Sequence, residues 1–409
     1  MRKSLSGSGL VSSAALACAV LAGSVCCDTA GAAGGTAHRA GATAQAASAG
    51  VAHAEAVLKL YQGKTAHYRT PSVPVNVPAG VRGKTVMYIP LLTEAPAFAI
   101  TESGLKAGLA SVGIKVSECN PNGTPTGVAA CISQALAQHV AGIVTDSIPY
   151  QEAANSFASA VAKHVPVLIT DQLKQPGTVG RYIQYLEGND NQPTLLADWM
   201  IADSAGHASV LVGEENDSPT AASFISNGVI PEFRKYCPGC TVKVIDVPLD
   251  PTQIASAVNT GLSRNPGTDY YDGEFEDEMQ GALQGIQQAG KASSLKVVFS
   301  TGTVAGLTDI KNHASGLYAE VGDDVVYQGW AEADEMLRML AAQPTVTEHI
   351  PERIFDRANI GTISVTGASQ ASGVWYGDPG AFKAAFRKLW SGHAKQHAAS
   401  RVHRVTRGS

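Results

Sequence analysis

The chain lacks the short motifs that mark common catalytic sites. It has no zinc-protease helix motif, no phosphate-binding P-loop and no G-x-S-x-G nucleophile elbow. No pairing of a nucleophile with a general base is visible, so we expect no enzymatic activity, no cofactor and no metal site. Charged residues make up only 16% of the 409 residues, and the net charge is -5. So mild a charge argues against nucleic acid as the main partner.

Cysteine is scarce, and its placement is informative. Three of the seven cysteines lie in or beside an apolar N-terminal stretch: Cys18, Cys26 and Cys27. The other four lie in the body of the chain: Cys119, Cys131, Cys237 and Cys240. An even number in an exported protein suggests two disulfides, with pairing between neighbours in sequence; the alternative is four buried free thiols. The C-P-G-C segment precedes a predicted strand rather than a helix, which favours a structural disulfide over a redox site.

The N-terminus has the pattern of a secretory signal peptide, assigned to residues 1–32. Arg2 and Lys3 precede an apolar stretch over about 10–25, which is short and serine-broken for a permanent membrane helix. Cleavage after Ala30-Gly31-Ala32 would release a free protein, whereas a lipid on Cys26 or Cys27 would anchor it. We expect an exported protein, extracellular or at the cell surface, with free and lipid-anchored forms both open.

Short apolar segments typical of strands alternate with predicted helices in two successive runs along the chain. The first run has its strands at 86–90, 114–116, 141–144 and 165–169, and the second at 210–212, 242–245, 269–271 and 295–299. Strands alternating with helices predict βαβ units and parallel sheets. Two such runs predict two α/β domains, which the chain length also favours. Ligands of open parallel sheets bind beyond the carboxyl ends of the strands, so one ligand could lie between the two sheets.

The remaining segments set the expected boundaries. Residues 33–82 are predicted to be a flexible spacer because 29–54 is rich in Ala, Gly, Thr and His, although 54–62 could form a short helix. A further strand is expected at 182–186 and a late one at 360–366, followed by a terminal helix at 381–390. The basic stretch 393–409 is predicted to be a disordered tail.

Several fragments in order resemble the type I periplasmic solute-binding proteins, the ribose- and galactose-binding group that serves ABC importers. The fragments that resemble this family lie at 95–98 with 102–104, 141–146, 165–171, 280–290, 318–322, 329–338 and 386–390. The last two resemble the sugar-importer branch of actinobacteria. The resemblance implies an α/β fold of two Rossmann-like lobes, each a parallel sheet flanked by helices, joined by a three-crossing hinge. Lobe 1 would comprise 83–188 and 323–345, and lobe 2 would comprise 189–322 and 346–392.

Matching positions to this family suggests ligand-binding residues at the strand ends. Asp171 stands where a hydroxyl-binding aspartate is expected, and Phe98 where a ring stacks on the sugar. Gln172 replaces the family's arginine, and Thr301 replaces an aspartate, which changes the expected set of solute contacts. The full candidate set is Glu94, Phe98, Asp146, Ser147, Asp171, Gln172, Glu215, Asn216, Phe275, Glu276 and Thr301.

The sequence therefore predicts a binding protein that captures a small polar solute, a sugar or polyol, and delivers it to an ABC permease as a monomer. Carboxylates at Glu94, Asp146, Asp171, Glu215, Glu274 and Glu276 leave a cationic or amine solute as an alternative. A second alternative is a surface sensor that signals to a membrane kinase. A LacI-type repressor shares the fold, but the DNA-binding helices are absent and the chain carries an export signal.

Overall fold

The computed structural model describes residues 31–188, 191–215, 219–248 and 250–391, without the side chains of 31–44 and 46. Contacts divide the chain into two units, Met1–Ala42 and Thr43–Ser409, and the second holds both sheets. The predicted signal peptide up to residue 30, with Cys18, Cys26 and Cys27, lies outside the described residues, as does the tail 393–409. No helix in the described part is both long and apolar enough to cross a membrane.

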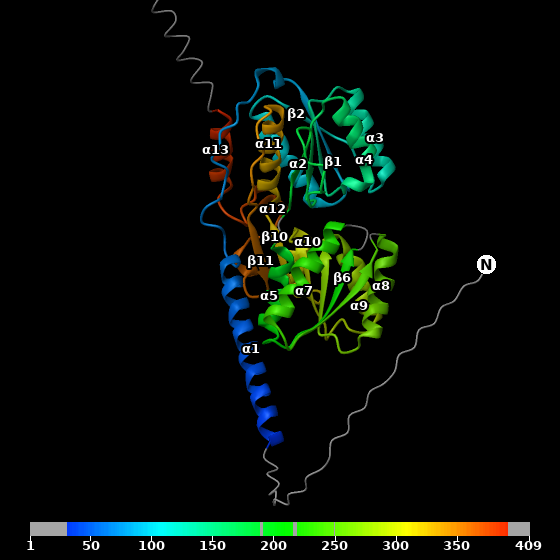
Figure 1. Ribbon diagram of the computed structural model, residues 1–409, viewed down its shortest axis with the longest axis vertical. Coiled ribbons are helices and arrows are strands. Elements are labelled where there is room, and N and C mark those ends of the chain that lie inside the picture. Colours follow the sequence, from blue (N-terminus) through cyan, green and yellow to red (C-terminus); the bar gives the residue numbers. More distant parts are fainter. Residues whose placement is uncertain (1–30, 189–190, 216–218, 249, 392–409) are drawn as a thin grey trace, which may run out of the picture. The chain divides into compact units, whose positions relative to one another are not determined.

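The first lobe is built on a parallel sheet with the order β2-β1-β3-β4-β5 (Figure 1). Its strands are β1 (Thr85–Pro90), β2 (Lys115–Glu118), β3 (Gly142–Asp146), β4 (Val167–Thr170) and β5 (Ile183–Leu186). Its helices are α2 (Pro96–Ala110), α3 (Pro125–Ala137), α4 (Tyr150–Ala162), α11 (Val325–Leu340) and α13 (Pro379–Trp390). Side chains alternate along β1: Tyr88 joins the core with α2, α11 and α13, whereas Met87 and Ile89 join the core with α3 and α4.

The second lobe has a six-stranded sheet with the order β11-β10-β9-β8-β6-β7, in which only β11 is antiparallel to its neighbour. Its strands are β6 (Ser209–Glu215), β7 (Thr241–Val247), β8 (Tyr270–Phe275), β9 (Lys296–Thr301), β10 (Leu317–Asp323) and β11 (Glu352–Asp356). Its helices are α1 (Gly31–Tyr61), α5 (Gln192–Asp203), α6 (Pro219–Phe224), α7 (Ile230–Tyr236), α8 (Pro251–Arg264), α9 (Met279–Gln288), α10 (Val304–Asn312) and α12 (Gly367–Ser372). Residues 43–61 of α1, with α5 and α7, cover one face, and α8, α9 and α10 cover the other.

The N-terminal helix corrects the predicted flexible spacer. Residues 31–61 form α1, and from Ala54 to Leu58 its buried face packs on the second lobe. Alanine is the best helix former, and this segment carries it at many positions, which outweighs its glycines. The predicted short helix over 54–62 is confirmed as the end of this longer one. Beyond it, residues 62–84 lead to β1 and contain one 3₁₀ turn, Ala79–Val81.

Two C-terminal expectations were wrong. The late strand lies at 352–356 rather than 360–366, because Ile360–Thr362 forms a 3₁₀ turn and α12 follows. Helix α13 packs on the first lobe rather than the second: Phe382 and Phe386 lie in one core with Tyr88 and Trp330. The chain therefore crosses between the lobes twice more than the predicted three-crossing hinge, once between α1 and β1 and once just before α13.

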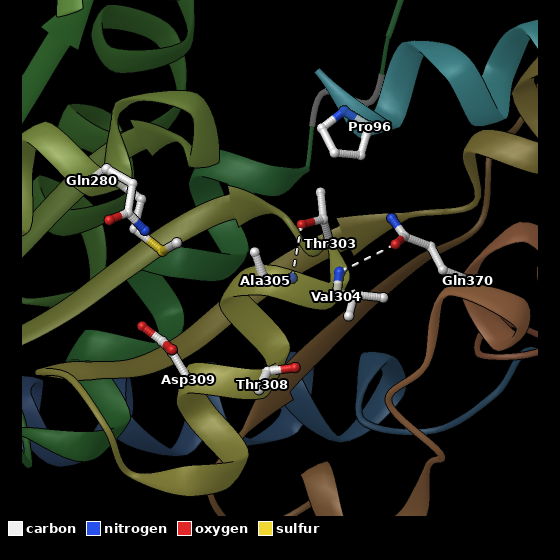
Figure 2. A pocket seen from close by; sticks show the side chains of 9 residues that line it. Pro96, Gln280, Thr303, Val304, Ala305, Thr308, Asp309 and Gln370 are labelled. Carbon is white, nitrogen blue, oxygen red and sulfur yellow. Dashed lines mark hydrogen bonds between the residues drawn. The ribbon is translucent and has the colours of Figure 1, made fainter. Parts of the chain in front are cut away.

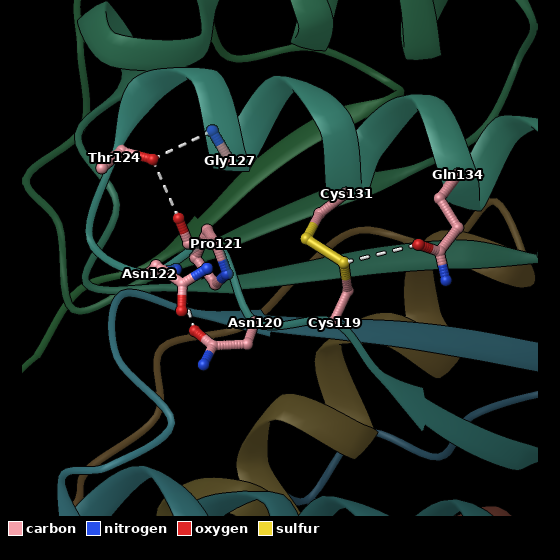
Figure 3. The surroundings of a disulfide bond; sticks show 8 residues. All are labelled: Cys119, Asn120, Pro121, Asn122, Thr124, Gly127, Cys131 and Gln134. Carbon is pink, nitrogen blue, oxygen red and sulfur yellow. Dashed lines mark hydrogen bonds between the residues drawn. A yellow bond between two sulfur atoms is a disulfide. The ribbon is translucent and has the colours of Figure 1, made fainter.

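The two expected disulfides are present and local. Cys119 at the end of β2 is bonded to Cys131 in α3, with 5.7 Å between their Cα atoms (Figure 3). Cys237 and Cys240 are bonded at the end of α7, directly before β7. The side chain of Thr124 caps helix α3 by accepting the backbone N–H of Gly127 at 3.1 Å, and Pro125 is the first residue of the helix.

Candidate functional site: the facing strand ends

The carboxyl ends of the two parallel sheets face each other. Thr220, which follows β6 in the second lobe, donates a hydrogen bond from its hydroxyl to Oε1 of Gln172, which follows β4 in the first, at 2.8 Å. Pro96, after β1, lines the same pocket as Thr303, after β9 (Figure 2). Because ligands of parallel sheets bind beyond the carboxyl ends of strands, a solute between the lobes would meet residues of both sheets.

In the first lobe, two predicted aspartates lie together at this edge. Asp146 ends β3 and is fully buried, and Asp171 follows β4. The hydroxyl of Tyr88 donates to Oδ2 of Asp146 at 2.5 Å, while Nε2 of Gln328 donates to Oδ2 of Asp171 at 2.7 Å. The same amide lies 3.4 Å from Oε1 of Glu332. The result is a cluster of three carboxyl groups held by one phenol and one amide.

This cluster has unusual electrostatics. Burial raises the pKa of Asp146 well above its usual range, and the nearby carboxylates of Asp171 and Glu332 raise it further. Burial also raises the pKa of Asp171. For Glu332, burial and then Asp171 raise the pKa to about 8. Such groups can both donate and accept hydrogen bonds near neutral pH, which suits a hydroxyl-rich solute.

The second lobe presents its own buried carboxyls at the ends of β6 and β8. Glu215 ends β6, and its backbone N–H donates to Oε2 of Glu274 at 3.0 Å. Within the described residues, Oε1 of Glu274, Oδ2 of Asp272 and both carboxylate oxygens of Glu278 have no hydrogen-bond partner. Burial raises the pKa of Asp272 to about 8 and, together with Glu215 and other carboxylates, that of Glu278 to about 10.

Three of the predicted residues have a left-handed backbone where their strands end. Ser147 follows β3 with φ of 59°, Asp171 follows β4 with φ of 54°, and Thr301 ends β9 with φ of 103°. A positive φ is costly for a β-branched residue such as Thr301. Strain of this kind gathers at functional sites, where the surrounding structure holds it. Its recurrence at three strand ends favours this edge as the binding site.

The aromatic candidates are both partly exposed. Phe98 lies in the first turn of α2, and its carbonyl oxygen accepts a bond from the Tyr88 hydroxyl at 3.4 Å. Phe275 ends β8, and its ring centroid lies 6.2 Å from that of Phe224. Exposed Glu94 accepts a bond from Asn120 at 3.3 Å, at the outer side of the loop after β1.

Three candidates differ from the picture suggested by sequence. The carboxylate of Glu276 is already hydrogen-bonded to residues at the start of α10. It accepts bonds from the backbone N–H and the hydroxyl of Thr303 and from the backbone N–H of Gly306, at 2.6, 2.5 and 2.9 Å. The side-chain oxygen of Gln172 already accepts the hydrogen bond from the Thr220 hydroxyl. Asn216 lies outside the described residues.

A pocket of about 470 Å³ opens beside these residues rather than among them. Its lining includes Pro96, Gln280, Thr303, Asp309 and Gln370, which Figure 2 shows around the start of α10. Of the predicted ligand residues that the structure describes, none lines it. The pocket therefore marks the flank of the facing strand ends.

Sequence reasoning missed Tyr88, Gln328 and Glu332. Tyr88 lies within an apolar strand, so the hydrophobic pattern gives no sign that its hydroxyl has a polar role. Gln328 and Glu332 stand four residues apart in α11, so they share one helix face. That spacing of two polar residues, one turn apart in a helix that also carries many apolar residues, is the signal that could have revealed them.

The match to a family profile agrees with this geometry. Residues 86–344 match the profile described as "Periplasmic binding protein domain", which covers most of the chain. The chain belongs to the periplasmic binding protein family. The family consists of solute-binding proteins that work outside the cytoplasm, and the predicted type I fold of two α/β lobes is confirmed. Comparison with curated protein sequences finds no match.

Solved structures share this fold at low sequence identity. A solute-binding protein of an ABC transporter from Agrobacterium vitis, bound to α-D-tagatopyranose, is 18% identical with a TM-score of 0.60, over 68% of this chain and 96% of that one. A solute-binding protein of a 5-methylthioribose transporter from Thermotoga lettingae is 15% identical with a TM-score of 0.61, over 78% of this chain and 99% of that one. A sugar ABC transporter protein from Yersinia enterocolitica is 17% identical with a TM-score of 0.62, over 78% of this chain and 98% of that one.

Proposed function

We propose that this chain captures a sugar or polyol between its lobes and delivers it to an ABC permease. The observation that carries the proposal is the pair Asp146 and Asp171 at adjoining strand ends, facing the acidic strand ends of the second lobe. Solved relatives of the same fold hold tagatose, allitol or myo-inositol. Carboxyl groups and amides are the usual partners of such hydroxyls.

The capture requires no chemical reaction. Hydroxyls of the solute would bond to Asp146 and Asp171, and the rings of Phe98 and Phe275 would cover its apolar C–H faces. Closing the lobes excludes water, and the lower local dielectric strengthens each hydrogen bond. The solute shifts the lobes toward the closed arrangement because it binds that arrangement better.

The test is a thermal-shift screen of sugars, polyols, amines and nucleosides, followed by calorimetry on the best hit. A ligand that binds only the folded state raises the melting temperature by mass action. We expect hits among sugars or polyols, and Asp171→Asn should weaken the best one at least about tenfold. The matched control is Asp309→Asn, in the flanking pocket, which should leave the affinity unchanged. An unaltered affinity in Asp171→Asn would refute the assigned site.

A cationic solute is a second candidate, supported by one specific observation. Five buried carboxyls at the facing strand ends take part in no salt bridge with a described basic side chain: Asp146, Glu332, Asp272, Glu274 and Glu278. An ammonium group would compensate them. Stabilisation by amines alone in the same screen would replace the sugar proposal with this one.

The partner and location follow from the proposed transport role. We propose an exported monomer, free or lipid-anchored, that docks on a permease. A neighbouring permease and ATPase gene would support the importer role, and a neighbouring kinase gene would support the sensor role. Light scattering of the purified protein tests the monomer, and mass analysis of the mature N-terminus tests the lipid.

A further inference from the structure

Three side chains from distant parts of the chain converge beneath the N-terminal helix. His53 lies on α1, Asp198 on α5 and Glu232 on α7, helices labelled in Figure 1. One ligand atom from each lies within 4.8 Å of the other two. Nε2 of His53 is 3.5 Å from Oε1 of Glu232. An imidazole and two carboxylates at such separations form a donor set that zinc uses in proteins.

Asp198 gives a second reason to expect a ligand here. Its side chain is only 1% exposed, and its Oδ1 has no hydrogen-bond partner among the described residues. A buried acceptor left without a partner is costly. A bound cation would supply the missing partner.

Packing, rather than the ion pair, fixes the imidazole. The ring of His53 stacks on Tyr236 with 3.6 Å between centroids and 9° between planes. One turn earlier, Gly50 lets α1 approach α7 closely, because a Cβ there would lie 1.7 Å from the carbonyl oxygen of Tyr236. Fully buried Ala54 follows His53. The three ligands are therefore brought together before any metal binds.

We propose that His53, Asp198 and Glu232 bind a divalent transition-metal ion, with Zn²⁺ as the probe, and that the ion clamps α1 onto the second lobe. Three protein ligands leave a coordination position for water. Because imidazole is present, zinc and its neighbours suit the set better than calcium or magnesium. The His53 side chain is 34% exposed, which provides an entry path. Helix α1 lies outside the matched region 86–344, so the clamp belongs to a part that the family profile does not cover.

A second acidic group meets the same distance criterion but favours no metal. Asp334, Glu335 and Glu348 lie within 4.8 Å of one another. However, Nε of Arg338 lies 2.7 Å from Asp334 and 3.8 Å from Glu335. The guanidinium already compensates these carboxylates, so this group is an ion-pair network.

The experiment uses the untagged full chain, stripped of metal and titrated with Zn²⁺. We expect one Zn²⁺ per chain by equilibrium dialysis, a raised melting temperature, and slower tryptic cleavage at exposed Lys59 near the end of α1. His53→Ala should lower the affinity at least about 100-fold and abolish both other effects. The matched control is His164→Ala, another histidine beside a tyrosine ring, 5.3 Å from Tyr182, in no metal-ligating group of the described residues.

A second variant guards against a folding defect. Asp198→Asn keeps the volume of the side chain but removes its charge, and it should weaken Zn²⁺ at least about tenfold without loss of circular dichroism. Retention of zinc by His53→Ala within about threefold of the parent affinity would overturn the proposal, as would failure of the parent chain to bind Zn²⁺. None of these readouts depends on solute binding.

Discussion

The hydroxyl of Thr220 in the second lobe donates a hydrogen bond to Oε1 of Gln172 in the first lobe, at 2.8 Å. The same hydroxyl oxygen accepts the backbone N–H of Leu173 at 3.3 Å. Both Thr220 and Gln172 are buried. One threonine therefore satisfies two groups of the facing lobe, which makes it a bridge between the strand ends where the solute is proposed to bind.

Thr220→Val should loosen the two lobes. Valine fills the same volume but leaves Oε1 of Gln172 and the N–H of Leu173 without this partner, at a cost of about 1–3 kcal/mol in the bridged arrangement. We expect the best solute to bind roughly fivefold or more weakly, with a larger radius of gyration by small-angle scattering.

The control for this bridge is Thr194→Val. The Thr194 hydroxyl donates to the carbonyl oxygen of Asn191 at 2.9 Å within the second lobe, so its loss should leave both readouts near the parent values. If Thr220→Val and Thr194→Val changed affinity equally, the bridge would have no role in lobe closure.

Much of the fold could be predicted because hydrophobic pattern and topology agree. Each apolar run in the two strand series became a strand of a parallel sheet, from Thr85–Pro90 to Lys296–Thr301. Local pairing of the cysteines also follows from sequence, because short loops close easily. These features depend on local pattern, which a single chain displays directly.

Other elements could not be predicted because tertiary contacts decide them. Strand β11 exists because Glu352–Asp356 pairs with β10 across the sheet edge, although its sequence includes three charged residues. Helix α13 joins the first lobe because Phe382 and Trp330 pack together, and its sequence fits either lobe. The clustering of Asp146 and Asp171 could be predicted because both lie where neighbouring strands end. The hydrogen bonds between Glu276 and the start of α10 could not, because they join residues that are far apart in sequence.

Glu276 should contribute to stability rather than to solute binding. Its carboxylate holds the start of α10 through Thr303 and Gly306. Glu276→Ala should lower the free energy of unfolding by about 2 kcal/mol, because it removes a helix cap and buried hydrogen bonds. Urea denaturation measures this. Glu94→Ala, at an exposed candidate, should change stability by less than about 0.5 kcal/mol. Equal effects of the two variants would contradict the capping role.

The disulfides should differ in their contribution to stability. Cys119 and Cys131 are separated by 12 residues, and Cys237 and Cys240 by 3. Loop-closure entropy predicts about 3 kcal/mol for the longer loop and about 2 kcal/mol for the shorter one. Paired replacement by serine, Cys119→Ser with Cys131→Ser, should therefore reduce the free energy of unfolding more than the equivalent change at the C-P-G-C segment. Urea midpoints in the reverse order would show that native-state contacts dominate.

Stability of the solute-free protein should fall as pH rises from 5 to 8. Burial raises the pKa of Glu332 from an ordinary 4.5 to about 8, so the folded state holds this proton more tightly than the unfolded chain. A raised carboxyl pKa contributes stability that is complete below about pH 4.5 and is lost as pH rises through about 8. Burial raises the pKa of Asp272 to about 8 and of Asp324 to about 7, so both act in the same direction.

Glu332→Gln isolates this effect because glutamine resembles the protonated acid in shape and does not titrate. Gln328 and Asp171 would still surround it. The parent should lose unfolding free energy between pH 5 and pH 8 in urea titrations, and Glu332→Gln should lose less. Glu55→Gln, at an exposed position on α1, should follow the parent curve. Parallel curves for Glu332→Gln and the parent would mean that Glu332 is already ionised in the folded protein at pH 5. Glu332 would then meet the solute as an anion, which favours the amine candidate over the sugar.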